Sequence, residues 1–209
     1  MKRNSENVEG GDLSVGGSEG HRSGSLYGIS VEYGLHCLLW LMEDKRRASS
    51  RDLAEIQGVS VAMMAKIMPR LERGGIVSSR DGIKGGYELA KPPTTISILD
   101  VVDAIEGKRK IFDCKDVRRG CVLFVGEPPS WAVSGVCRIH AVMLRAEEAM
   151  RSSLSTTTLA DLAQGEGRPR EFEDMVATWF GDRKTAREDA RVAAVRESSR
   201  GGSTAKKPL

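Results

Sequence analysis

Residues 49–93 read SSRDLAEIQGVSVAMMAKIMPRLERGGIVSSRDGIKGGYELAKPP, and this stretch decides the fold. Its first part has the signals of two short helices, each with serine at its start and glycine at its end. The serines are Ser49 or Ser50 for the first helix and Ser60 for the second, and the glycines are Gly58 and then Gly74 with Gly75. Two short helices joined by a turn of three or four residues are typical of a helix-turn-helix.

The second part, from Ile76 onward, predicts a strand, a glycine-rich turn, a second strand and a Pro–Pro stop. This pattern indicates a two-stranded wing beside the helix-turn-helix. TISILDVVDAIEG, residues 95–107, then predicts a capped amphipathic helix that ends at Gly107. The fold class is therefore mainly α with a small β wing, a winged helix-turn-helix.

Further helices are expected on both sides of this stretch. ISVEYGLHCLLWLMED, residues 29–44, is dense in apolar residues and predicts a largely buried helix. After Cys137, apolar residues recur every three or four positions, which predicts a long dimerisation helix. We expect a disordered N-terminal extension over 1–25, the DNA-binding domain over 26–107, a cysteine-containing loop over 108–137, the dimerisation helix and a short following helix over 138–163, and a mostly disordered C-terminal extension over 164–209.

Composition limits the class of protein without deciding it. The 209 residues have a net charge of +3, which permits nucleic acid as a partner but does not demand it. No apolar run is long enough to cross a bilayer and the start is polar, so we expect a cytoplasmic protein with no membrane partner. Four cysteines without an export signal favour metal binding, redox chemistry or burial over disulfides.

Polar and cationic residues follow the helix-turn-helix and the wing, as a DNA-binding surface requires. The predicted DNA contacts are Arg51, Ser60, Lys66, Arg70, Arg73, Arg80 and Lys84. Pro69 lies inside the second helix and is expected to break it or change its course. Met63 and Met64 are predicted to be buried. The alternative is that these cations are ordinary solvated charges, but their conjunction with the motif favours DNA.

Cysteines after the wing have a spacing that suggests a metal site. Cys114, Cys121, Cys137 and His140 form C-x6-C-x15-C-x2-H. The positive end of a helix and two neighbouring arginines favour the charged, metal-binding form of these thiols. Soft thiolates select zinc, copper(I) or iron–sulfur clusters, and the paired knuckles of common structural zinc sites are missing. Cys37, among leucines, is predicted to be a core residue.

VEYGLHCLLWL, residues 31–41, together with residues 49–107 and the later TTLADL, resembles the Rrf-two family of winged-helix regulators. The likeness covers roughly residues 27 to 163, and residues 31–37 are closest to the redox-sensing, RsrR-like branch. The resemblance implies a homodimeric, sequence-specific DNA-binding regulator, with repression the expected direction, that recognises a partly palindromic double-stranded operator.

The same resemblance implies an iron–sulfur cluster held by Cys114, Cys121 and Cys137. A cluster usually needs four protein ligands, so at least one more is required. Glu32 and His36, at i and i+4, share a helix face and are the candidates. Mixed ligation favours [2Fe–2S] over [4Fe–4S], and the cluster's redox state or occupancy is expected to switch operator binding. His140 resembles a ligand of IscR-like members and is the reserve.

Two other functions stay open at this stage. The first is a cluster-free winged-helix regulator controlled by thiol oxidation or by a protein partner. The second is a metal-dependent enzyme, which would need a substrate pocket with paired acid and base groups. The sequence contains no Ser–His–Asp set, phosphate loop or zinc hydrolase motif, so we predict that the chain is not an enzyme.

Overall fold

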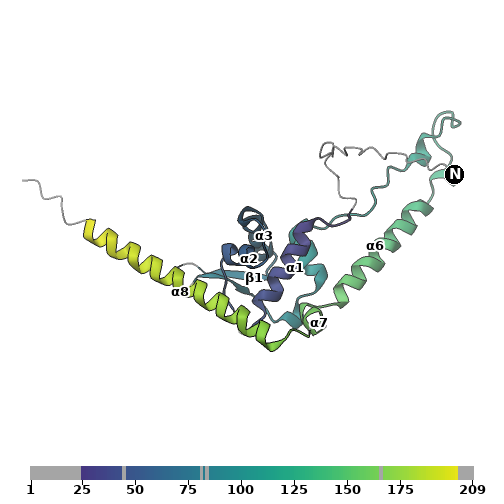
Figure 1. Ribbon diagram of the computed structural model, residues 1–209. Coiled ribbons are helices and arrows are strands. Elements are labelled where there is room, and N and C mark those ends of the chain that lie inside the picture. The colour runs from purple at the N-terminus through teal and green to yellow at the C-terminus, as the bar shows by residue number, and fades with distance from the viewer. Residues whose placement is uncertain (1–24, 44–45, 81, 83–84, 165–166, 202–209) are drawn as a thin grey trace, which may run out of the picture.

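The computed structural model describes residues 25–43, 46–80, 82, 85–164 and 167–201. Helices dominate these residues, and a single pair of strands accompanies them there (Figure 1). In chain order the elements are α1 (Ile29–Leu41), α2 (Ser50–Ile56), α3 (Val61–Arg73), β1 (Val77–Arg80), β2 (Gly86–Leu89), η2 (Pro93–Thr95), α4 (Ile98–Glu106), η3 (Val117–Gly120), α5 (Ser130–Val133), α6 (Arg138–Thr156), α7 (Leu159–Gln164) and α8 (Arg170–Gly201).

Serine caps set the starts of α2 and α3, as the sequence predicts. The Ser49 hydroxyl accepts a hydrogen bond from the Asp52 backbone N–H at 3.1 Å, and the Asp52 carboxylate accepts one from the Ser49 N–H at 3.0 Å. This reciprocal pair is a capping box. Ser60 caps α3 by accepting from the Met63 N–H at 3.1 Å. Gly58 turns the chain between them with φ of +65°, and the helix-turn-helix is confirmed.

Pro69 does not interrupt α3. The helix continues through it to Arg73, so the expected break is wrong. The side of α3 that faces the core carries Met68 just before the proline and Leu71 just after it, and neither is exposed. Packing of these side chains holds both turns in place, which offsets the loss of one backbone hydrogen bond at the exposed proline.

The wing is the antiparallel pair β1 and β2, with Val77 opposite Leu89. Near the turn, β2 is joined to the residue before the α2 cap, because Ala48 and Tyr87 exchange backbone hydrogen bonds with N···O distances of 3.1 and 2.9 Å. Glycine is required at position 86, where φ is +135° and a Cβ would lie 2.9 Å from the Ala48 backbone. The wing is therefore fixed beside α2.

The core lies where α1 packs against α3, α4 and α7. The closest approach is at Gly34 of α1, where a Cβ would lie 2.3 Å from Ile105 Cδ1 of α4 and 3.5 Å from Ile67 Cγ2 of α3. Both isoleucines are buried. The largest fully buried side chains around them include Leu38, Leu41, Leu53, Met64, Met68, Leu71, Ile76, Val101 and Leu159. Three helices thus meet at one glycine.

Helix α6 runs away from this core, and the cysteine-containing segment lies toward its far end (Figure 1). Arg151 ties α6 to α4 through two hydrogen bonds to the Asp103 carboxylate, at 3.0 and 2.7 Å. No residue of α6 is buried, and Ile139 and Val142 are more than half exposed. The cysteine-containing segment also exposes apolar side chains, including Trp131, which is 76% exposed.

The end of the chain is the main correction to the sequence analysis. We expected residues 164–209 to be mostly disordered, but Arg170–Gly201 forms α8, a helix of 32 residues. Val176 and Phe180 bury against the winged helix and are 5% and 6% exposed, which anchors the helix. The segment is rich in charged residues, and the burial of these two apolar side chains stabilises it. Residues 1–24, where disorder was also predicted, lie outside the described residues.

None of the helices in the described ranges is both long enough and apolar enough to span a bilayer. The long helix α8 fails this test because charged residues recur along it.

We predict that Gly34→Ala lowers the free energy of unfolding by about 1 to 3 kcal/mol, because the added methyl group overpacks the contact with Ile105. Chemical denaturation followed by circular dichroism, at one fixed protein concentration, measures the change. Gly181→Ala is the matched control, since nothing lies within 4 Å of a Cβ at that position. Equal stability of the two variants would contradict the role given to Gly34.

Candidate functional site

The outer faces of α2 and α3 present two of the predicted DNA contacts to solvent. Lys66 is exposed on α3, on the opposite side from the buried Met64 and Met68. Arg51 is exposed near the start of α2. Within the described ranges, neither side chain is held by a hydrogen bond or an ion pair. Both cations are therefore available to an external anion.

Three other predicted contacts already have partners inside the protein. The Ser60 hydroxyl caps α3, as described above. Arg70 Nη1 donates to the Ile105 carbonyl at 2.9 Å, which ties the end of α3 to the end of α4. Arg73 Nε donates to the Pro69 carbonyl at 3.3 Å. These side chains have structural roles of their own, and their contact with DNA stays a prediction.

Arg80 of β1 lies on the wing and is 63% exposed. It pairs with Glu88 at 3.2 Å, and Glu88 also accepts a hydrogen bond from Arg47 Nε at 2.7 Å. The hydrogen bond from Arg47 and the charges of both arginines hold the pKa of Glu88 below its ordinary value, so this carboxylate is ionised at neutral pH. Lys84, the other predicted wing contact, lies outside the described residues.

Arg187 and Arg191 of α8 are cations beside the wing that sequence reasoning missed. They line a cleft of about 610 Å³ together with Ser49 and Arg80. The signal in the sequence is the spacing of Arg183, Arg187 and Arg191 at i, i+4 and i+8, which places them along one helix face. This spacing has structural meaning only in a helix, and the segment was expected to be disordered.

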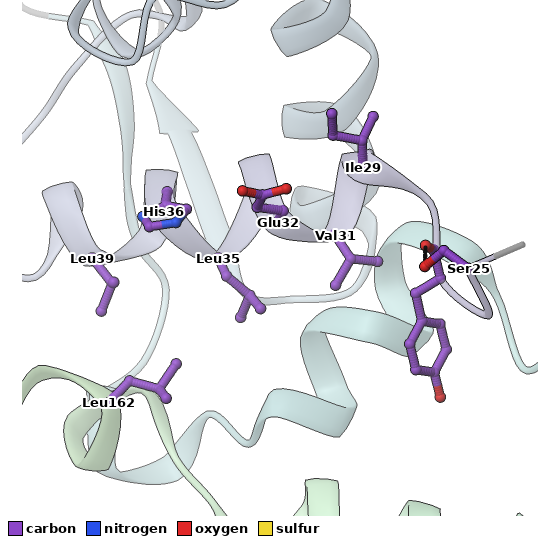
Figure 2. A pocket seen from close by; sticks show the side chains of 9 residues that line it. Ser25, Ile29, Val31, Glu32, Leu35, His36, Leu39 and Leu162 are labelled. Carbon is purple, nitrogen blue, oxygen red and sulfur yellow. Dashed lines mark hydrogen bonds between the residues drawn. The ribbon is translucent and has the colours of Figure 1, made fainter. Parts of the chain in front are cut away.

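Glu32 and His36 lie one turn apart on α1, as their spacing predicts (Figure 2). Both are exposed, and both line a cleft of about 640 Å³. Leu35 and Leu39 point from the same helix toward Leu162 of α7 and form the apolar part of this cleft (Figure 2). Within the described ranges, no hydrogen bond or ion pair engages the Glu32 carboxylate or the His36 ring.

Two of the three predicted cysteine ligands lie close to one cation. The charge of Arg118 interacts with Cys114 and with Cys137, and its Nη2 donates to the Gly135 carbonyl at 3.2 Å. Arg118 Nε also pairs with Asp116 at 2.6 Å. Cys114 and Cys137 are half-buried. The segment between α4 and α6 therefore folds back so that both thiols share a positive neighbour.

Cys137 is the N-cap residue of α6, and this position activates its thiol. The backbone N–H groups of His140 and Ile139 at the start of the helix are the main reason that its pKa is lowered from the ordinary value. The charge of Arg118 acts in the same direction, and Asp116 opposes it. A thiolate at a helix N-terminus is both a better metal ligand and a better nucleophile.

The structure does not bring the predicted ligands together within the described residues of the chain. In the described ranges, no three His, Cys, Asp or Glu side chains lie close enough to hold a metal ion. Cys121 is exposed and follows η3, whereas Glu32 and His36 lie on α1. The identity of the ligands stays a prediction.

Cys37 and His140 have other surroundings. Cys37 is fully buried, and burial raises the pKa of its thiol to about 12, so it is a core residue as predicted. Its sulfur accepts a hydrogen bond from Gln57 Nε2 at 2.8 Å. The ring of His140, the reserve ligand, lies 6.1 Å from the ring of Phe112 between centroids.

Capped tandem helices, a fixed wing and a long projecting helix together define a winged-helix transcriptional regulator. Residues 28–165 match the Rrf2 family, described as "Iron-dependent Transcriptional regulator". The chain belongs to this family, which confirms the resemblance drawn from residues 31–41 and 49–107. It is a family of regulators and not of enzymes, as predicted.

Relatives and solved structures agree with this family. A Mycobacterium tuberculosis protein that bears the name of an HTH-type transcriptional regulator is 40% identical over 114 residues, which cover 54% of this chain and 65% of that protein. The protein named rrf2 of Nitratidesulfovibrio vulgaris is 33% identical over 54% of this chain and 69% of its own length. T. potens IscR has the same fold, with a TM-score of 0.50 and 22% identity over 71% of this chain and 97% of its own.

We predict that the apo protein's Cys137 reacts with iodoacetamide at a lower pH than an ordinary thiol does, because its pKa is lowered. Arg118→Ala removes a stabilising charge and shifts the midpoint of reaction upward. Quantification of the modified peptide by mass spectrometry across a pH series measures the midpoint. Arg119→Ala is the control, because Arg119 also pairs with Asp116 but does not act on Cys137. Equal midpoints for both variants would rule out the effect of Arg118.

Proposed function

We propose that the chain binds double-stranded DNA in the cytoplasm as a homodimer and represses transcription, with α3 in the major groove and the wing on flanking phosphates. The fixed winged helix carries this proposal. The two helices are separately capped, and the Ala48–Tyr87 pairing holds the wing beside them. In such motifs the second helix enters the groove, and Lys66 is exposed on that helix.

Helix α6 supplies the dimer interface in this proposal. No residue of α6 is buried within one protomer, although apolar side chains recur along it at three- and four-residue spacing. A helix with such a stripe gains stability by packing on another helix. The exposed members of this stripe are Ile139, Val142, Ala146 and Ala149.

We further propose that an iron–sulfur cluster controls DNA binding, as in the redox-sensing, RsrR-like branch of the family. The donor chemistry supports this, because the three cysteines between α4 and α6 offer the soft thiolates that clusters take. Glu32 and His36 would complete the set from the partner protomer, since one protomer does not gather the donors. This mixed set favours [2Fe–2S] over [4Fe–4S], with His140 in reserve. When bound, the cluster would supply one-electron redox chemistry.

Side-chain contacts offer a route from the cysteine-containing segment to the recognition helix. Cys137 begins α6, and Arg151 of α6 holds Asp103 of α4. Arg70 of α3 then holds the Ile105 carbonyl at the end of α4. A change in the position of α6 would therefore move α4 and, with it, the C-terminal end of α3. In a dimer this alters the spacing of the two recognition helices, on which DNA affinity depends.

Lys66→Ala is predicted to weaken binding to a duplex selected from a randomised pool, by about 1 to 3 kcal/mol if the side chain reads a base edge. Fluorescence anisotropy at a fixed salt concentration measures the affinity. Lys108→Ala, an exposed lysine in the loop after α4, is the control and should bind like the unaltered protein. Unchanged binding by Lys66→Ala would remove α3 from the proposed interface.

The cluster proposal predicts a brown protein after purification without oxygen, with visible absorbance and circular dichroism bands that bleach on reduction with dithionite. Cys137→Ser should lose these bands, and Glu32→Ala or His36→Ala should shift them. Cys37→Ala, which changes the buried cysteine, should keep them. A colourless protein after attempted reconstitution would overturn the cluster and leave a regulator controlled by its thiols or by a protein partner.

A further inference from the structure

Three arginines of α8 form a row that faces the winged helix. Arg183 pairs with Glu55 and Arg187 pairs with Asp52, so α2 supplies a carboxylate for each of the first two. Arg191 comes one turn later and lies at the cleft beside the wing. In the described part of the chain, no carboxylate lies within ion-pair distance of Arg191. The row therefore ends in a cation without an acidic partner.

The cleft at the end of this row is cationic. The described residues that line it include Arg80, Arg187 and Arg191 and no Asp or Glu. Among the described residues, Glu88 offsets the charge of Arg80 and Asp52 offsets that of Arg187, and no carboxylate there pairs with Arg191. Guanidinium groups offer paired N–H donors that match the geometry of phosphate oxygens. The cleft therefore has the chemistry of a phosphate-binding site.

The position of Arg191 is set by the anchored half of α8. Phe180 is buried and has the Arg46 guanidinium 4.5 Å from its ring centroid, while the Arg183 guanidinium lies 4.9 Å from the Trp179 ring centroid. Beyond these contacts the helix passes close to β1 and continues past the winged helix (Figure 1). Arg191 is thus held at the wing by the helix and does not depend on a flexible tail.

Charge along α8 changes sign at this point. Residues 170–182 contain one Lys or Arg and four Asp or Glu, whereas residues 183–201 contain six Lys or Arg and three Asp or Glu. The acidic half begins where the helix anchors, and the basic half begins where it approaches the wing. A basic segment beside a wing lies where DNA phosphates flank the groove that the recognition helix enters.

We propose that α8 is a third DNA-contacting element, in which Arg191, with Arg80 and Arg187, binds a backbone phosphate of the duplex beside the wing. This element lies beyond residue 165, where the match to the Rrf2 family ends. The inference rests on the DNA binding proposed above and is independent of the cluster. Contact with phosphate adds affinity without reading sequence, so α8 would lengthen the bound stretch of DNA.

The test uses the full chain and a random-sequence duplex, with affinity measured by fluorescence anisotropy between about 50 and 200 mM salt. Each neutralised phosphate contributes about 0.9 to the slope of log affinity against log salt. Arg191→Ala is expected to weaken binding several-fold at low salt and to reduce the slope by about that amount for each bound protomer. Arg191→Lys should restore most of the slope, because it keeps the charge.

Arg196→Ala is the matched control, since it removes the same charge from the same helix but lies roughly 140° around it from Arg191. If Arg191→Ala and Arg196→Ala leave the slope unchanged while Lys66→Ala weakens binding to the selected duplex, the α8 contact is overturned and the winged-helix interface stands. If Lys66→Ala also has no effect, the proposed DNA interface fails as a whole. Equal losses from Arg191→Ala and Arg196→Ala would indicate only general attraction and would also overturn the phosphate site.

Discussion

The contact among Gly34, Ile67 and Ile105 is the constraint on which the other features depend. At this point α1 approaches α4 more closely than a larger side chain at position 34 would allow, and it is also in contact with Ile67 of α3. Each helix carries a different part of the proposed machinery. Helix α1 carries Glu32 and His36, α3 presents Lys66, and α4 is tied to α6. Because packed interiors leave little free space, a shift of one helix at this point would displace the other two.

Polar contacts extend this arrangement to the periphery, and each one joins elements that are far apart in the sequence. Arg151 and Asp103 join α6 to α4, while Arg187 and Asp52 join α8 to α2. Asp52 is only 3% exposed, and its carboxylate also accepts a hydrogen bond from the Ser49 N–H, so one buried acid serves both the start of α2 and the docking of α8. The winged helix is therefore held by two further helices, by α6 through α4 and by α8 through α2.

The sequence was most informative where a local rule fixes the backbone. Serine caps, the glycine turns and the wing follow from such rules, and the structure confirms them. The break predicted at Pro69 was wrong because packing of Met68 and Leu71 outweighs the tendency of proline to interrupt a helix. Helix α8 was missed because two apolar residues, Val176 and Phe180, anchor a segment that is otherwise charged. No local pattern shows that Arg70 is occupied by the Ile105 carbonyl, since that contact joins positions 35 residues apart.

Trp131 gives the cysteine-containing segment a spectroscopic label of its own. The chain has three tryptophans, and Trp40 and Trp179 are half-buried while Trp131 is largely exposed beside Phe124. Emission from an exposed indole lies at long wavelength and moves to shorter wavelength when the ring leaves water. Covering of Trp131 by a second molecule, or any change of this segment that buries the ring, would thus appear as a blue shift. Intrinsic fluorescence can follow events at the thiols without any added dye.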